Sequence, residues 1–216
     1  VPVPEATELE RVLPVIEAVR DRLPNAIVTI DTVKASVARA ALAAGAHAVN
    51  DVSGGRLDPA MFEVVATAGA GMIIMHSRGT VADMASYTHA DYGDVTAEVG
   101  RDLLAQVALA RAAGIAEACI VLDPGLGFAK RSEHSITLLH ELPRLVALGY
   151  PVLVGASRKR FIGDVTGVRV PAQRAIGSAV AHALAVQRGA SIVRTHDVRA
   201  TCEALAVMQA LTPSPH

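Results

Sequence analysis

Six short apolar segments, each followed by polar residues and then by a helical pattern, recur along this 216-residue chain. Such segments, alternating with helices, are typical of parallel strands that are buried on both faces. The predicted strands end at Asp31, Asn50-Asp51, His76 and Asp123, before Ser157-Arg158-Lys159, and at Arg194-Thr195-His196-Asp197. Helices are predicted after them over about 33–44, 58–68, 94–113, 133–147, 171–188 and 198–211, and one more over 7–23 precedes the first strand.

Six strand–helix units after a single helix predict an α/β fold. A doubly wound open sheet would accommodate six strands, but its glycine-rich phosphate turn normally follows the first strand. Here Asp31-Thr32-Val33-Lys34 stands at that position. We therefore expect a (β/α)₈ TIM barrel that is N-terminally incomplete in this chain, without its first strand–helix unit and its second strand. No linker divides the chain, so we expect one domain over 1–211 and a disordered tail over 212–216.

Composition narrows the class of protein. Half of the residues are hydrophobic, there is no Trp, and the formal net charge is −1 without a long run of one sign. No basic patch or stripe indicates a nucleic-acid partner. No apolar stretch reaches the roughly 18 residues of a membrane span, and no signal peptide is visible. Cys119 and Cys202 lack metal-ligand spacing, so we read them as buried thiols and expect a cytoplasmic protein.

The polar strand ends are the candidate site, because the carboxyl ends of barrel strands surround one mouth. Asp31 and Asn50 each end a strand, and an amide can both donate to and accept from a heterocycle. A helix cap at Asp31 and an Asn- or Asp-stabilised turn at Asn50 are the alternatives. A lone His76 is more often structural than catalytic.

The segment 123–130, DPGLGFAK, is more specific. A carboxylate, Asp123, is followed by two glycines that let backbone approach a ligand closely. Phe128 is one of only three Phe in the chain, and its place in a polar loop favours a pocket wall. The phosphate-binding P-loop spacing is absent. A plain turn after the strand is the alternative.

Cationic groups follow the last two strands. Lys159 can hydrogen-bond a carbonyl or ring nitrogen and hold an anion as a point charge. Period-two alternation places Arg194 and His196 on one face and Thr195 on the other, which favours an anion clamp in which Arg194 binds phosphate. A solvated basic loop and a structural Arg–Asp pair are the alternatives.

These stretches together resemble the dihydropteroate synthase family, whose members are targets of sulfonamides. The matching segments include MIIMHSRG, LDPGLGFAK, GASRKRF and RTHDVR, and they occur in the family's order over nearly the whole chain. The resemblance implies a pterin-binding TIM barrel. It also implies a transferase that joins 6-hydroxymethyl-7,8-dihydropterin diphosphate to p-aminobenzoate, releasing pyrophosphate and forming 7,8-dihydropteroate for folate biosynthesis.

The resemblance also assigns roles. Substrate-binding residues are expected at Asp31, Asn50, Met75, Asp123, Phe128, Gly155, Ser157, Lys159, Arg194, Thr195 and His196. Of these, Asp31, Lys159, Arg194 and His196 are the expected catalytic groups. Asp31, Asn50 and Asp123 bind the pterin and Met75 and Gly155 line its pocket. Phe128 and Ser157 lie on the p-aminobenzoate side, Lys159 contacts the pterin and borders that side, and Arg194 and His196 hold pyrophosphate.

The family's N-terminal part carries two loops that do not match here. One supplies a ligand for Mg²⁺, the expected cofactor, so no metal ligand is expected among these residues; the other helps to close the site. A polypeptide that starts at Val1 is therefore expected to have little synthase activity. The remaining hypotheses are a pterin-binding methyltransferase domain and a non-catalytic pterin-binding relic. The expected partners are the small-molecule substrates and, as a homodimer, a second copy of the chain.

Overall fold

The computed structural model of this protein describes residues 3–212 and contains all six predicted strands. They are β1 (Thr29–Asp31), β2 (Ala48–Asp51), β3 (Gly71–Met75), β4 (Ile120–Asp123), β5 (Leu153–Val154) and β6 (Ile192–Val193). The α-helices are α1 (Glu5–Arg22), α2 (Ala35–Ala43), α3 (Met61–Ala68), α4 (Val95–Ala112), α5 (Ser132–His140), α6 (Leu142–Val146), α7 (Arg160–Thr166), α8 (Ala175–Gln187) and α9 (Val198–Leu211). Short 3₁₀ turns lie at Glu117–Cys119 and Pro171–Gln173. Apart from Thr212, the tail predicted to be disordered lies outside the described residues.

All strand pairs are parallel, as predicted. One sheet has the order β1-β2-β3-β4 and a second contains β5 and β6. A single bridge between Leu122 and Val152 joins the two, so the strands follow one another in chain order as in a barrel wall. Within residues 3–212, β6 does not pair with β1, and the wall is open there.

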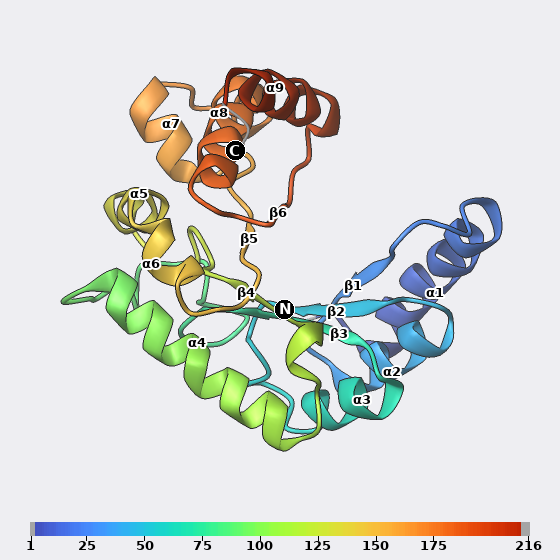
Figure 1. Ribbon diagram of the computed structural model, residues 1–216. Coiled ribbons are helices and arrows are strands. Elements are labelled where there is room, and N and C mark those ends of the chain that lie inside the picture. The colour runs from blue at the N-terminus through green and yellow to red at the C-terminus, as the bar shows by residue number, and fades with distance from the viewer. Residues whose placement is uncertain (1–2, 213–216) are drawn as a thin grey trace.

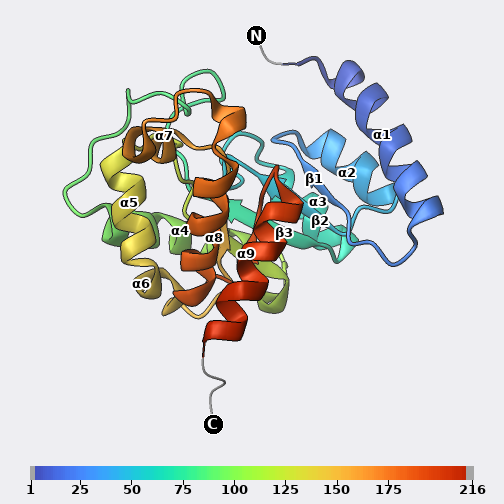
Figure 2. The ribbon, with the colours of Figure 1, turned by 90° about the horizontal axis from the view of Figure 1, so that it is seen from above.

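The helices cover the outside of this wall. Helices α1–α3 lie beside β1–β3, and α4 continues this layer along β3 (Figure 1). Helices α8 and α9 lie side by side near β5 and β6, with α7 at the far end of α8 (Figure 2). None of the helices within residues 3–212 combines the length and the apolarity that a membrane crossing requires.

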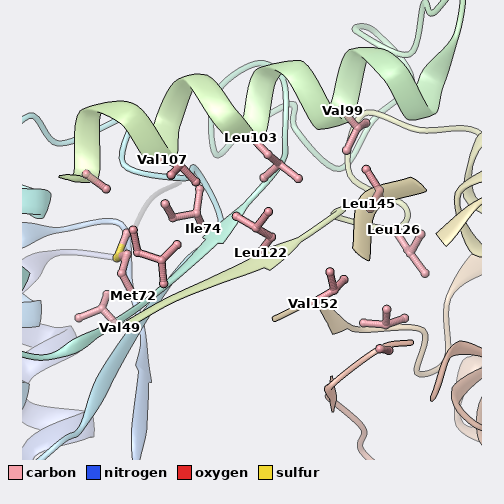
Figure 3. Packing of buried hydrophobic residues seen from close by; sticks show 14 of the residues in the cluster. Val49, Met72, Ile74, Val99, Leu103, Val107, Leu122, Leu126, Leu145 and Val152 are labelled. Carbon is pink, nitrogen blue, oxygen red and sulfur yellow. The ribbon is translucent and has the colours of Figure 1, made fainter. Parts of the chain in front are cut away.

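A continuous apolar core packs α4 onto the sheet. Leu103 and Val107 of α4 lie over Ile74 and Leu122 of the neighbouring strands β3 and β4 (Figure 3). Val152, next to β5, continues the same cluster across the bridge. The core therefore spans the junction between the two sheets and holds their strand ends at one edge.

Two helical segments differ from the prediction. The helix expected over 133–147 is divided into α5 and α6 near Glu141, because Pro143 lacks the N–H that a continuous helix would need there. Helix α7 was not predicted; it has seven residues, ends at Gly167 with φ +75°, and is too short for a clear apolar period.

Leu122 offers a test of this packing. It is 1% exposed at the bridge, so Leu122→Ala should lower the free energy of unfolding by about 3 kcal/mol through a lost side chain and a cavity. Leu109 of α4 is 56% exposed, so Leu109→Ala should lower the free energy of unfolding by less than about 0.5 kcal/mol. Urea unfolding measures both changes, and equal losses would contradict a core centred on this junction.

Candidate functional site

The strand register brings four predicted site residues to one edge of the larger sheet. Asp31 of β1 is paired with Asn50 of β2, and Met75 of β3 with Asp123 of β4. The Asn50 amide nitrogen donates to a carboxylate oxygen of Asp31 over 3.0 Å. Asp31 and Asn50 of the predicted acid–amide–acid set are therefore direct neighbours. Asp123 lies at the same carboxyl edge, with β3 between it and Asn50, because Val121 rather than Asp123 is level with Asn50.

Asn50 and Asp123 are buried polar groups. The Asn50 side-chain oxygen has no hydrogen-bond partner among the described residues, although the side chain is only 6% exposed. Asp123 accepts a hydrogen bond from the Gly125 amide over 2.7 Å. Burial raises the pKa of the Asp123 carboxyl to about 6, against the lowering effect of this hydrogen bond and of nearby cations. Both side chains can receive hydrogen bonds from a flat, donor-rich ligand.

A cavity of about 580 Å³ opens next to these strand ends. Seven of the predicted residues line it: Phe128, Gly155, Ser157, Lys159, Arg194, Thr195 and His196. Asp31, Asn50, Met75 and Asp123 do not line this cavity but lie along the ends of β1–β4. The predicted set thus forms two adjoining groups.

The alternation predicted for 194–196 continues beyond the end of β6 at Val193. Arg194 and His196 are exposed, whereas Thr195 between them is half-buried and its side chain contacts Thr201 of α9. Thr195 also contributes to the lining of the same cavity as Arg194 and His196. Its hydroxyl accepts a hydrogen bond from the Asp197 amide over 3.2 Å and lies 3.0 Å from the Thr201 hydroxyl.

Lys159 connects the two groups. Its ammonium lies 4.0 Å from the centre of the Phe128 ring, within cation–π range. Burial lowers the pKa of Lys159 to about 8, while the carboxylate of Asp123 opposes the shift and Arg194 adds to it. A lysine with this pKa keeps most of its charge near neutral pH and holds it beside an aromatic wall.

Two pairs of residues join the loops after β5 and β6. Ser157 Oγ lies 2.9 Å from His196 Nδ1 and accepts a hydrogen bond from the His196 amide over 3.1 Å. The Arg158 guanidinium donates to both carboxylate oxygens of Asp197, over 3.1 and 2.8 Å. Arg158 also lines the cavity but is engaged by Asp197, so Lys159, Arg194 and His196 are the remaining basic side chains along its lining.

Arg194 reaches across the open side of the wall. Its guanidinium donates to Asp31 over 2.9 Å, and the two side chains are 60% and 44% exposed. The structural Arg–Asp alternative is therefore realised, with Asp31 as the acid. An exposed pair of this kind contributes only about 0–1 kcal/mol, so Arg194 can leave it for a stronger anion.

The sequence did not single out a buried chain of groups behind this site. Lys130 is 1% exposed, and its ammonium lies 2.9 Å from His76 Nδ1. His76 Nε2 in turn lies 3.3 Å from a carboxylate oxygen of Asp102. Burial lowers the pKa of His76 to about 3, so its ring is neutral. No spacing in the sequence links these residues, because Lys130 and His76 are 54 positions apart.

Within residues 3–212, no group of three or more His, Cys, Asp or Glu side chains is placed to hold a metal ion. Magnesium usually binds through one or two carboxylates together with waters and substrate phosphates, so a magnesium site does not require such a group.

Comparisons with known proteins agree with this geometry. A model of the pterin binding enzyme family matches residues 1–196. The dihydropteroate synthase of Mycobacterium leprae (strain TN) is 50% identical over 208 residues, which cover 94% of this chain and 72% of that protein. The Escherichia coli (strain K12) dihydropteroate synthase is 38% identical, with 94% and 70% covered.

Solved structures give the same result. A Xanthomonas albilineans dihydropteroate synthase with 4-aminobenzoic acid superposes with a TM-score of 0.92 at 44% identity, over 100% of this chain and 75% of that one. A Thermus thermophilus dihydropteroate synthase in complex with 6HMPPP gives 0.87 at 47% identity, over 98% and 79%. The chain therefore belongs to the dihydropteroate synthase family of pterin-binding transferases, which share the TIM-barrel fold.

Proposed function

We propose that the strand-end residues of this chain bind 6-hydroxymethyl-7,8-dihydropterin diphosphate and p-aminobenzoate and join them to 7,8-dihydropteroate. The observation that carries the proposal is the arrangement of three kinds of group around one mouth. The buried amide and acid Asn50 and Asp123, the basic pair Arg194 and His196, and the aromatic wall at Phe128 adjoin one another. Related structures contain 4-aminobenzoic acid, 7,8-dihydropteroate and 6HMPPP.

The buried polar groups fit the pterin. Asp123 has one carboxylate oxygen beyond the one that accepts from Gly125, and Asn50 has an acceptor without a partner among the described residues. A buried acceptor without a donor is costly, so a ligand that brings N–H groups to this edge gains binding free energy. Met75 and Gly155 would contact the flat ring.

The cationic groups fit the diphosphate. Arg194 and His196 face the cavity from the loop after β6, and both are exposed enough to receive an anion. Arginine can bind phosphate oxygens in a bidentate manner. A pterin-binding methyltransferase has no diphosphate to hold, so this pair favours the synthase over that alternative.

The third part of the cavity fits p-aminobenzoate. The Phe128 ring and the Lys159 ammonium would contact an aromatic amine that carries a carboxylate, with Ser157 nearby. Sulfonamides resemble this substrate in shape, so we include them as competing ligands of the same subsite.

The reaction is a substitution at the exocyclic methylene of the pterin. The bond from this carbon to the diphosphate oxygen breaks and pyrophosphate departs with the electron pair. The amine nitrogen of p-aminobenzoate then forms a bond to the carbon. Arg194 and His196 stabilise the negative charge that develops on the departing pyrophosphate. Asp31 would stabilise the positive charge that the pterin carbon carries between these two events. The amine then loses a proton to solvent, and no protein nucleophile is needed.

We propose Mg²⁺ as the cofactor that accompanies the diphosphate, since magnesium commonly binds through substrate phosphates. No step of the proposed reaction is assigned to it. We also propose a cytoplasmic location, in keeping with the two free cysteines. The prediction that both cysteines are buried thiols is wrong: Cys119 is half-buried and Cys202 is exposed.

We further propose that the chain forms a homodimer through helices α7 and α8. Ile176, Val180 and Leu184 form a stripe on one face of α8 and are 81%, 53% and 43% exposed. Together with Val165 of α7 they line an apolar groove of about 680 Å³. A second copy, related by a two-fold axis, would bury this face against its own equivalent.

The anion clamp has a direct test. Arg194→Ala should weaken binding of the pterin diphosphate roughly 10- to 100-fold, because a charge-assisted hydrogen bond is worth about 1.5–3 kcal/mol. Binding of the corresponding pterin alcohol should change less than threefold. Calorimetry measures both affinities, and pyrophosphate release with both substrates and Mg²⁺ measures turnover. Arg199→Ala removes a 94% exposed arginine from α9 and is the matched control. Equal losses for the two ligands would contradict the clamp.

Asp123 should make stability depend on pH in a defined direction. Its pKa is about 6 in the folded protein against an ordinary value of 3.8. Between these values the folded chain retains a proton that the unfolded chain has lost, so stability falls as pH rises from about 4 to 6. The free energy of unfolding of Asp123→Asn, relative to the parent, should therefore rise by roughly 2–3 kcal/mol across this window. Urea unfolding at several pH values measures it.

Asp21→Asn, which removes an exposed carboxyl from α1, serves as its control for the loss of one negative charge. A constant difference between Asp123→Asn and the parent across this window would show that the carboxyl titrates normally.

The dimer proposal predicts that Ile176→Lys yields a monomer, because two buried charges would face each other across the two-fold axis. Val207→Lys introduces the same charge at a 60% exposed apolar position on α9 and should leave the dimer intact. Sedimentation velocity distinguishes the species. A monomeric parent at micromolar concentration, or dissociation by both variants, would refute this interface.

A further inference from the structure

Lys130 has an unusual environment for a lysine. It is 1% exposed and forms no ion pair among the described residues. Its ammonium instead contacts His76 Nδ1 at 2.9 Å, the Phe128 carbonyl at 3.1 Å and, more distantly, the His76 carbonyl at 3.5 Å. Burying a cation without a carboxylate partner costs free energy, so these contacts need a physical reason.

His76 is built to accept this contact. Its ring is neutral and its Nε2 faces Asp102, so the ring proton belongs on Nε2 and the lone pair on Nδ1 faces Lys130. Burial lowers the pKa of Lys130 to about 7, yet a neutral amine still has two hydrogens to donate. The contact with the Phe128 carbonyl can therefore persist in either protonation state.

The loop that carries Phe128 is held at several other points. The Ala129 amide donates to the Met84 carbonyl over 2.6 Å, and the Tyr92 hydroxyl donates to the Ala129 carbonyl over 3.0 Å. Ala129 has φ +47°, a left-handed conformation that a residue with a Cβ adopts only when its surroundings impose it. At Gly125 any Cβ would lie 1.9 Å from the His76 carbonyl oxygen.

We infer that Lys130 is a positioning residue: with His76 it holds the Phe128 carbonyl and so fixes the Phe128 ring against the Lys159 ammonium. The inference rests on the proposed function, in which Phe128 and Lys159 form the p-aminobenzoate side of the site. Gly127 supports this coupling, because a Cβ there would lie 3.3 Å from Lys159 Cδ. The backbone at 127–128 and the lysine side chain thus pack directly on each other.

Fluorine NMR tests the positioning without requiring turnover. The chain has three Phe, so labelling with 4-fluorophenylalanine gives three signals, from Phe62, Phe128 and Phe161. Lys130→Met, which keeps the length of the side chain and removes its donors, should shift the Phe128 signal and leave the other two in place. Val107→Ala, a buried change on α4, controls for general destabilisation and should move none of them.

Kinetics of the same variants separate a positioning role from a structural one. Lys130→Met should raise the KM for p-aminobenzoate about tenfold and the KM for the pterin diphosphate less than threefold. His76→Leu should behave in the same way. His76→Asn, which keeps an acceptor near the position of Nδ1, should restore the Phe128 signal and most of the affinity for p-aminobenzoate. These paired variants keep the test informative if Lys130→Met does not fold.

Two outcomes would overturn the inference: an unchanged Phe128 signal in both Lys130→Met and His76→Leu, or the same shift in Val107→Ala. A different result would bear on the proposed function itself. If Phe128→Leu leaves the KM for p-aminobenzoate unchanged, Phe128 does not belong to that subsite, whatever Lys130 does to the ring.

Discussion

The parallel backbone ladder from β1 to β4 is the constraint on which the site depends. Its register pairs Asp31 with Asn50 and Met75 with Asp123, so side chains up to 92 positions apart lie at one edge. A one-residue slip in any pair would turn the alternating side chains to the opposite face. The apolar contacts of α4 with Ile74 and Leu122 oppose such a slip, so the core fixes the chemistry of the strand ends.

Electrostatics at this edge follow from burial. Burial raises the pKa of the Asp123 carboxyl. The nearby cations Lys159 and Lys130 lower this pKa, but by less than burial raises it. The pKa values of both lysines are lowered in turn, chiefly by burial. The pKa of the acid is thus raised toward neutral pH and the pKa values of the two lysines are lowered toward it. A ligand that adds hydrogen-bond donors for Asp123 and negative charge near Lys159 favours the ionised form of both.

The sequence predicted the six strands, most helices and the seven residues that line the strand-end cavity, because apolar period and polar strand ends are local signals. It did not predict helix α7, which is too short for a clear apolar period. It also did not predict the contact between Lys130 and His76, which depends on two loops that meet only in the folded chain. Residues proposed to contact a ligand stand out in the sequence by their residue type at a strand end. Residues that position them are recognised only by the side chains that they contact in the folded chain.

Two contacts join the β1–β4 sheet to the β5–β6 part of the structure at opposite sides of the wall. One backbone bridge joins β4 to β5, while Arg194 reaches Asp31 from the loop after β6, on the opposite side. Because that ion pair is largely exposed, its loss costs little, and an anion bound by Arg194 would exchange one partner for another. Under the proposed function, Asp31 would then be free of its cation before positive charge develops on the pterin carbon. Binding of the diphosphate by Arg194 would in this way prepare the carboxylate that the proposed reaction uses.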